Sequence, residues 1–236
     1  MLVKTKAIVI SVVKYQEKSL VVKCFTASDG MKSYFVRNAF SGKKADQKIA
    51  YFQPFSLLEL EADHKNKGTL EHFKEIKIAF PYQTLHVDLY KSAMVLFLSE
   101  IVHHSIREEE KNGPLFSFLE AALIQLDTQP HWPNFHLKLL IELSKHLGFY
   151  PEQVTDYPFF DLSDGLFTTN QGLLSLSEHE TFLFKKLLKL EWNNFEKVFT
   201  NSERRLLLTV VLNYFSIHLH GFKKPKSLEV LTALFT

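Results

Sequence analysis

The chain has 236 residues, 46% of them hydrophobic, and a net charge of +2, which excludes a disordered chain and allows one large domain or two small ones. Its single cysteine, Cys24, excludes an intramolecular disulfide and a multi-cysteine zinc site. The first residues lack the apolar core and cleavage site of a signal peptide, and no apolar run reaches the roughly 20 residues of a membrane span, so we expect a soluble cytoplasmic protein.

Five short segments of the first eighty residues have the composition of β-strands. They are rich in Val, Ile and Phe or alternate apolar and polar residues, and turn signals such as Ser28-Asp29-Gly30 separate them. The expected strands are 3–13, 20–26, 31–37, 55–62 and 69–78. Five mainly antiparallel strands in this length are typical of a small closed barrel, and the OB-fold is the commonest such barrel that binds nucleic acid.

Helical periodicity replaces the strand pattern after Pro81, where we expect a domain boundary between residues 1–80 and 81–236. Apolar residues then recur at spacings of three and four. The expected helices are 84–106, 113–127, 134–147, 177–190, 202–220 and 227–235. Residues 149–176 lack this period and form an expected irregular insert. The fold class is therefore α+β, with a five-stranded barrel followed by a helical domain.

Positive charge is concentrated in the barrel segment. Residues 1–80 carry 14 Lys and Arg against 8 Asp and Glu, a balance of +6, whereas residues 81–236 carry 14 against 18, a balance of −4. Phosphate contacts require only positive side chains on a suitable surface, so this asymmetry indicates a binder of nucleic acid backbone. The candidate DNA-binding residues are Lys4, Lys6, Lys32, Arg37, Lys43, Lys44 and Lys48.

Aromatic residues are interleaved with these cations, and an exposed ring beside a cation can stack on a base of single-stranded nucleic acid. The interleaved rings are Tyr34, Phe35, Phe40, Tyr51 and Phe52. Aromatic residues are also commonly buried, so core packing is the alternative role for most of them.

An enzymatic function has less support in the sequence. Glu59, Glu61 and Asp63 alternate along one strand and invite a metal-dependent nuclease hypothesis, but such alternation is also how a half-buried sheet faces water. The histidine pairs lack the spacing of a zinc site, and Walker-type phosphate loops are missing from the sequence. We therefore expect no enzyme activity, no metal and no cofactor; a protein adaptor acting through its helical domain is a further alternative.

Several sequence fragments, taken together in order and spacing, resemble the RecO family of recombination mediator proteins. They span the whole chain and comprise residues 6–10, 17–26, 53–61, 68–70, 147–151, 218–221 and 226–231. The resemblance implies an OB-fold followed by a helical domain, acting without a chemical step. Many relatives carry a four-cysteine zinc module after the segment equivalent to 147–151, whereas residues 152–176 here contain no cysteine.

The resemblance also implies the function and the partners. Members of the family bind single- and double-stranded DNA, anneal complementary strands and help to load the RecA recombinase onto DNA coated by single-stranded DNA-binding protein. They act with RecR and, in many bacteria, with RecF, and they contact the acidic, apolar C-terminal tail of single-stranded DNA-binding protein. An apolar pocket rimmed by Lys or Arg on the helical domain would suit that tail.

Overall fold

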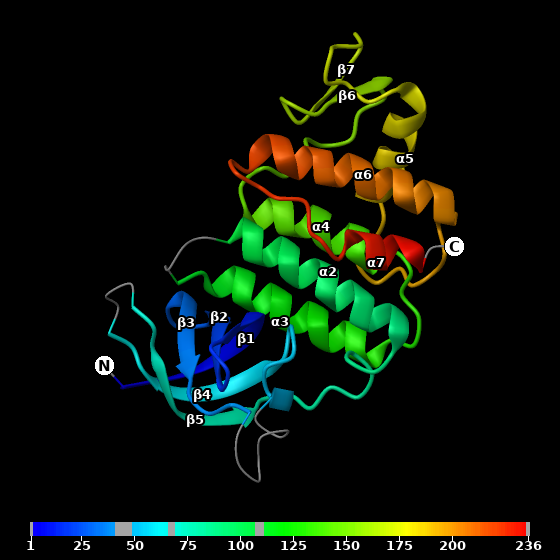
Figure 1. Ribbon diagram of the computed structural model, residues 1–236. Helices are drawn as coiled ribbons and strands as arrows, with labels where there is room; N and C mark the ends of the chain where they lie inside the picture. Colours follow the sequence, from blue (N-terminus) through cyan, green and yellow to red (C-terminus); the bar gives the residue numbers. More distant parts are fainter. Residues whose placement is uncertain (1, 41–48, 66–68, 107–110, 235–236) are drawn as a thin grey trace. The chain divides into compact units, whose positions relative to one another are not determined.

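The computed structural model describes residues 2–40, 49–65, 69–106 and 111–234. Two compact units make up the chain, one formed by Met1–Thr128 and the other by Gln129–Thr236. The first contains the five-stranded sheet and two helices, and the second contains the remaining helices and a small hairpin (Figure 1).

The N-terminal sheet has five antiparallel strands in the order β3-β2-β1-β4-β5. They are β1 (Leu2–Tyr15), β2 (Ser19–Thr26), β3 (Gly30–Val36), β4 (Leu57–Asp63) and β5 (His72–Ile78). Backbone hydrogen bonds between β3 and the residue before β5 bring the outer strands together. The sheet is the expected OB-fold, and the α+β fold class is confirmed.

Strand alternation sets the core of the barrel. In β4, Leu58, Leu60 and Ala62 are buried, whereas Glu59 lies on the outer face and is exposed. Cys24 of β2 is fully buried, as expected for a small apolar residue, and burial raises the pKa of its thiol. The buried cluster also includes Ala7, Val9, Leu20, Val22, Tyr34, Ala39 and Phe52.

Two helices belong to the same compact unit as the barrel. These are α2 (Leu89–Ser105), which contacts β1, and α3 (Gly113–Thr128). Phe25 of β2 and Phe116 of α3 pack with ring centroids 5.9 Å apart. The strands end at Ile78, close to the expected domain boundary, but the compact unit continues to Thr128 because α2 and α3 pack with the sheet.

The segment that leads into α2 is fixed by the end of α3. The Asp127 carboxylate accepts backbone N–H donations from Gln83 at 2.9 Å and from Thr84 and Leu85 at 2.7 Å each. Asp88 caps α2 by accepting from the backbone of Lys91 at 2.9 Å. The helix therefore begins at Leu89 and not at residue 84 as its apolar spacing predicts, because the preceding residues bind this carboxylate.

The second unit is mainly helical. Its helices are α4 (Phe135–His146), α5 (Glu178–Leu188), α6 (Asn201–His218) and α7 (Leu228–Ala233). Ser177 and Thr200 begin α5 and α6 with capping boxes, in which each hydroxyl and a glutamate three residues later satisfy backbone N–H groups reciprocally. Trp132, Trp192, Phe135 and Phe195 form an aromatic cluster beside α4.

The expected irregular insert contains a short hairpin, β6 (Phe159–Asp161) and β7 (Leu166–Thr168). Phe160 and Phe167 are buried and pack with centroids 4.9 Å apart, whereas Leu166 is 44% exposed. Asp161 holds the turn by accepting from the Ser163 backbone at 2.8 Å and from the Ser175 hydroxyl at 3.4 Å. Ring packing and these hydrogen bonds therefore hold this segment together, and the segment contains none of the cysteines of the relatives' zinc module.

Candidate nucleic-acid interface

A groove lies between β3 and β5, the two outer strands of the barrel sheet. Glu71 donates its backbone N–H to the Ser33 carbonyl at 2.8 Å, and Phe35 donates to the Glu71 carbonyl at 2.9 Å. In the described residues, these two hydrogen bonds form the backbone bridge between β3 and the residue before β5. Beyond it, side chains of both strands line a groove of about 400 Å³.

The groove combines aromatic walls with positive charge. Its lining consists of Phe35, Val36, Arg37, Tyr51, Phe52, Phe73, Lys74 and Ile76. Phe35, Tyr51 and Phe73 are each partly accessible, whereas Phe52 is buried beneath them. Accessible rings offer stacking surfaces for nucleic acid bases, and stacking tolerates every base because each has a π-face.

Two exposed cations stand on opposite edges of this groove. Arg37 follows β3, and its guanidinium carbon lies 5.9 Å from the centroid of the Phe35 ring. Lys74 is exposed on β5. Guanidinium and ammonium groups both bind phosphate oxygens, so the groove offers backbone contacts beside base-stacking surfaces.

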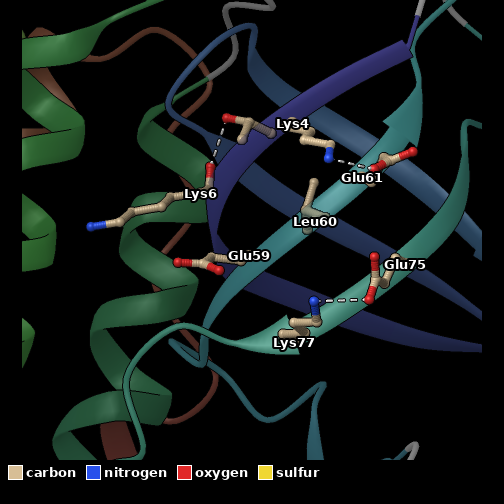
Figure 2. A pocket seen from close by; sticks show the side chains of 8 residues that line it. Lys4, Lys6, Glu59, Leu60, Glu61, Glu75 and Lys77 are labelled. Atoms are coloured by element: carbon tan, nitrogen blue, oxygen red, sulfur yellow. Dashed lines mark hydrogen bonds and ion pairs between the residues drawn. The ribbon is translucent and has the colours of Figure 1, made fainter.

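Lys4 and Lys6 lie on a different surface, the outer face of β1, β4 and β5, which we call the mixed-charge face (Figure 2). Lys4 pairs with Glu61 at 3.2 Å, and Lys6 pairs with Glu120 of α3 at 2.7 Å. Lys77 of the same face pairs with Glu75 at 2.9 Å. Carboxylates match the lysines here, so this face is not a continuous cationic patch.

The remaining candidate residues divide further. Lys32 is only 6% exposed, and its charge contributes to lowering the pKa of Asp29, so little of this residue is accessible to a phosphate. Lys43, Lys44 and Lys48 lie outside the described residues. Of the four candidates that the structure describes, only Arg37 lines the groove.

The aromatic candidates also separate into buried and accessible rings. Tyr34 is fully buried and Phe52 is 4% exposed, so both belong to the core. Phe40 is accessible and lies beneath the Lys14 ammonium, 5.4 Å from its ring centroid. Phe73 and Lys74 also line the groove but are not among the sequence candidates. They are consecutive residues of β5, and strand alternation alone would place them on opposite faces, so the sequence pattern does not bring them together.

The carboxylates of the nuclease hypothesis do not form a metal site in the described part of the chain. Glu61 pairs with Lys4, and His, Cys, Asp and Glu side chains form no group of three that could hold a metal ion within residues 2–40, 49–65, 69–106 and 111–234. Within the same residues, no helix is long and apolar enough to cross a bilayer.

The second unit carries a separate groove of about 440 Å³ along α5 and the loop that follows it. Its apolar walls come from Phe182, which is 64% exposed, together with Leu190 and Val198. Lys185, Lys186 and Lys189 surround them. We refer to this feature as the α5 groove.

Comparison with known proteins covers nearly the whole chain. The model of the N-terminal domain of recombination protein O matches residues 1–82, and the model of its C-terminal domain matches residues 86–229. Proteins named DNA repair protein RecO from Flavobacterium johnsoniae and Flavobacterium psychrophilum are each 60% identical to the chain over the full length of both sequences. The chain belongs to the RecO family. A further relative of the same name, from Bacteroides fragilis, is 37% identical over the full length of both sequences.

Family membership confirms the resemblance that the sequence fragments indicated and the OB-fold at the N-terminus. The relatives match the chain from end to end, including the cysteine-free insert. The insert therefore lies within the region that the chain shares with these relatives.

Proposed function

We propose that the protein is a DNA repair and homologous recombination mediator that binds single- and double-stranded DNA, anneals complementary strands and helps to load a recombinase. The observation that carries the proposal is the full-length match to proteins named DNA repair protein RecO, combined with an OB-fold groove that joins accessible rings to exposed cations. Binding and annealing need no bond to be made or broken, so no catalytic residue, cofactor or metal is assigned.

The groove supplies the two kinds of contact that single-stranded DNA requires. Arg37 and Lys74 bind successive phosphates on its edges, and Phe35, Tyr51 and Phe73 stack with bases between them. Lys43, Lys44 and Lys48 are three further cations in the chain between β3 and Tyr51, and we propose that they extend the phosphate contacts. Annealing follows because bound cations screen the repulsion between two strands held on one surface.

A salt titration of DNA affinity tests the groove. Each phosphate contact to a single strand contributes about 0.7 to the slope of log Kobs against log salt. Replacing both groove cations, by Arg37→Gln with Lys74→Gln, is therefore expected to reduce the slope by about 1.4. Replacing Lys43, Lys44 and Lys48 by Ala is expected to reduce it by about 2.

Two control variants make this titration specific. Lys4→Gln with Lys6→Gln removes two cations that already pair with carboxylates, so a smaller change of slope is expected. Lys145→Gln removes an exposed lysine of α4, and its slope should equal that of the parent. Unchanged affinity and slope in both the groove variant and the triple-lysine variant would refute the proposed mode of binding.

The α5 groove is the surface that we propose for the C-terminal tail of single-stranded DNA-binding protein. The tail is acidic and apolar, and the groove presents Phe182 between lysines. Lys185 donates to the Tyr157 carbonyl at 2.7 Å, and Lys186 donates to the Val198 carbonyl at 3.1 Å, which fixes both side chains. Each ammonium has three N–H groups, so both retain donors for a carboxylate.

Fluorescence anisotropy of a labelled tail peptide tests this partner. We expect Phe182→Ala and Lys189→Glu to weaken binding at least tenfold, since one removes the apolar contact and the other repels the acidic peptide. Lys145→Glu places the same new charge on α4 and should bind as the parent does. Equal affinity of all variants would place the tail elsewhere.

The α5 groove favours a second candidate function, that of a protein adaptor. In this role the helical unit contacts the protein partners. We propose RecR as a partner and extend the proposal to RecF and RecA. Co-purification of each from a mixture with the purified chain, with and without DNA, tests these assignments. An adaptor without DNA binding would retain the protein partners and show no salt-dependent affinity for DNA.

A further inference from the structure

The polar side chains of Asp29, His64 and Tyr34 form a hydrogen-bonded chain, which we call the polar chain. The His64 ring, 2% exposed and located directly after β4, is its centre. Its Nδ1 lies 2.9 Å from Oδ2 of Asp29, and its Nε2 lies 2.7 Å from the hydroxyl of Tyr34. Asp29 belongs to the turn before β3 and Tyr34 to β3 itself, so the polar chain connects three separate segments.

The charges around Asp29 determine the direction of these hydrogen bonds. Burial acts to raise the pKa of Asp29, but hydrogen bonds from Ser28 and His64 and the charge of Lys32 lower it overall. The carboxylate is therefore ionised and accepts a hydrogen bond from the Nδ1–H group of His64. Burial also raises the pKa of Tyr34, which keeps its hydroxyl protonated and paired with Nε2.

Stacked aromatic rings connect Tyr34 to the groove. Its ring lies almost parallel to Phe73, with centroids 4.1 Å apart and an angle of 16° between the planes. Phe73 is in turn near-parallel to Phe52, at 5.9 Å and 17°. Phe73 and Phe52 both line the groove, whereas Tyr34 is fully buried behind them.

We propose that the polar chain is a positioning device for base stacking, in which His64 fixes the Tyr34 ring and thereby the plane of Phe73 in the groove. The inference rests on the proposed function of the groove and adds two residues that touch no nucleic acid. Phe73 alone on the edge strand could tilt among rotamers, but a parallel ring held at its hydroxyl end restricts that motion. A fixed ring plane reduces the ordering that binding would otherwise require.

The alternative is that the polar chain only stabilises the barrel. Both roles predict a lower melting temperature when His64 is replaced, but only positioning predicts a change in base stacking at temperatures where the variant is fully folded. It also predicts an unchanged salt slope, because the polar chain contributes no cation to the groove surface.

The test uses the full chain and a single-stranded oligonucleotide containing 2-aminopurine, whose fluorescence is quenched when the base stacks. His64→Leu removes both hydrogen bonds and is expected to weaken binding about fivefold and to reduce the quenching, with the parent slope retained. His64→Gln has an amide that can both accept and donate, so it should restore most of the affinity and quenching.

Two further variants keep the test decisive. Tyr34→Phe retains the stacked ring but removes its hydroxyl, and it takes the place of His64→Leu if that variant does not fold. Tyr214→Phe removes a similar buried hydroxyl, which donates to the Phe149 carbonyl at 2.9 Å in the second unit, and it should lower stability without altering quenching.

The outcomes separate this inference from the proposed function. Parent-like affinity and quenching in folded His64→Leu, or a reduced salt slope in it, would overturn the positioning role. If Arg37→Gln with Lys74→Gln lowers the slope while His64→Leu has no effect, only the positioning role fails. If neither set of variants alters binding, the groove is not the DNA site and both proposals fail.

Discussion

Replacing Asp127 by asparagine tests how far a single carboxylate fixes the segment between the barrel and α2. The side chain is 3% exposed and accepts three backbone N–H groups, from Gln83, Thr84 and Leu85, at 2.7 to 2.9 Å. Asparagine has nearly the same shape, but it removes the charge and directs an N–H₂ group toward donors. The substitution therefore changes the electrostatics at almost constant volume.

The expected loss can be worked out from these bonds. Hydrogen bonds to a charged group contribute about 1.5–3 kcal/mol and those between neutral groups about 0.5–1.5 kcal/mol, so three weakened bonds cost about 3 kcal/mol. Relief from burying a charge offsets part of this cost, and we expect the free energy of unfolding to fall by about 2 kcal/mol. Glu17→Gln, at an exposed turn of the same unit, should change it by less than about 0.5 kcal/mol.

The effect should also depend on pH. Burial acts to raise the pKa of Asp127, but hydrogen bonds from Gln83, Thr84 and Leu85 lower it below its ordinary value of 3.8. A carboxyl whose pKa is lower in the folded state stabilises the protein above the unfolded-state pKa and loses that contribution as the pH falls through the folded-state pKa. The difference between parent and variant should therefore decrease below about pH 4.

Urea denaturation followed by far-UV circular dichroism measures both effects. Equal midpoints for the parent and Asp127→Asn at neutral pH would refute the calculation. A difference that stays constant in acid would show that the shape of the side chain, and not its charge, is responsible.

The remaining predictions concern the second unit. Burial and then the charge of Arg204 lower the pKa of His136 to about 3, so the unfolded chain takes up a proton below its ordinary pKa of 6.5 while the folded chain does not. The free energy of unfolding should thus fall as the pH decreases below 6.5, by at most about 1.4 kcal/mol per pH unit. His136→Leu should flatten this dependence in urea titrations at several pH values. Asp161→Ala removes the acceptor that holds the β6–β7 turn; we expect faster amide hydrogen exchange in residues 159–168 and a loss of about 1–2 kcal/mol, and unchanged exchange would contradict this role.

The barrel was predictable because its evidence is local. The residues that alternate with Glu59 and Glu61 along the expected strand 55–62 are apolar, which predicts that they face the core, and the structure buries them: Leu58, Leu60 and Ala62. The start of α2 was not predictable in the same way, because its apolar spacing continues into residues that bind Asp127, more than forty positions away. A local pattern contains no information about that partner.

The candidate interface shows the same limit. Arg37 was predicted and does line the groove, but counting positive residues could not separate it from Lys32, which is only 6% exposed. Lys4 and Lys6 could not be recognised as paired, because Glu61 comes from another strand and Glu120 from α3. Charge balance points to the unit that contains the groove, whereas pairing across the sheet decides which cations remain available.

Both tryptophans of the chain, Trp132 and Trp192, lie in the second unit, where their ring centroids are 5.3 Å apart. Indole emission excited at the red edge of absorption consequently reports on one half of the molecule. The barrel unit contains no tryptophan, whereas a peptide bound near α5 has a native reporter in its own unit. Tryptophan emission is therefore a label-free probe of the unit that contains the α5 groove.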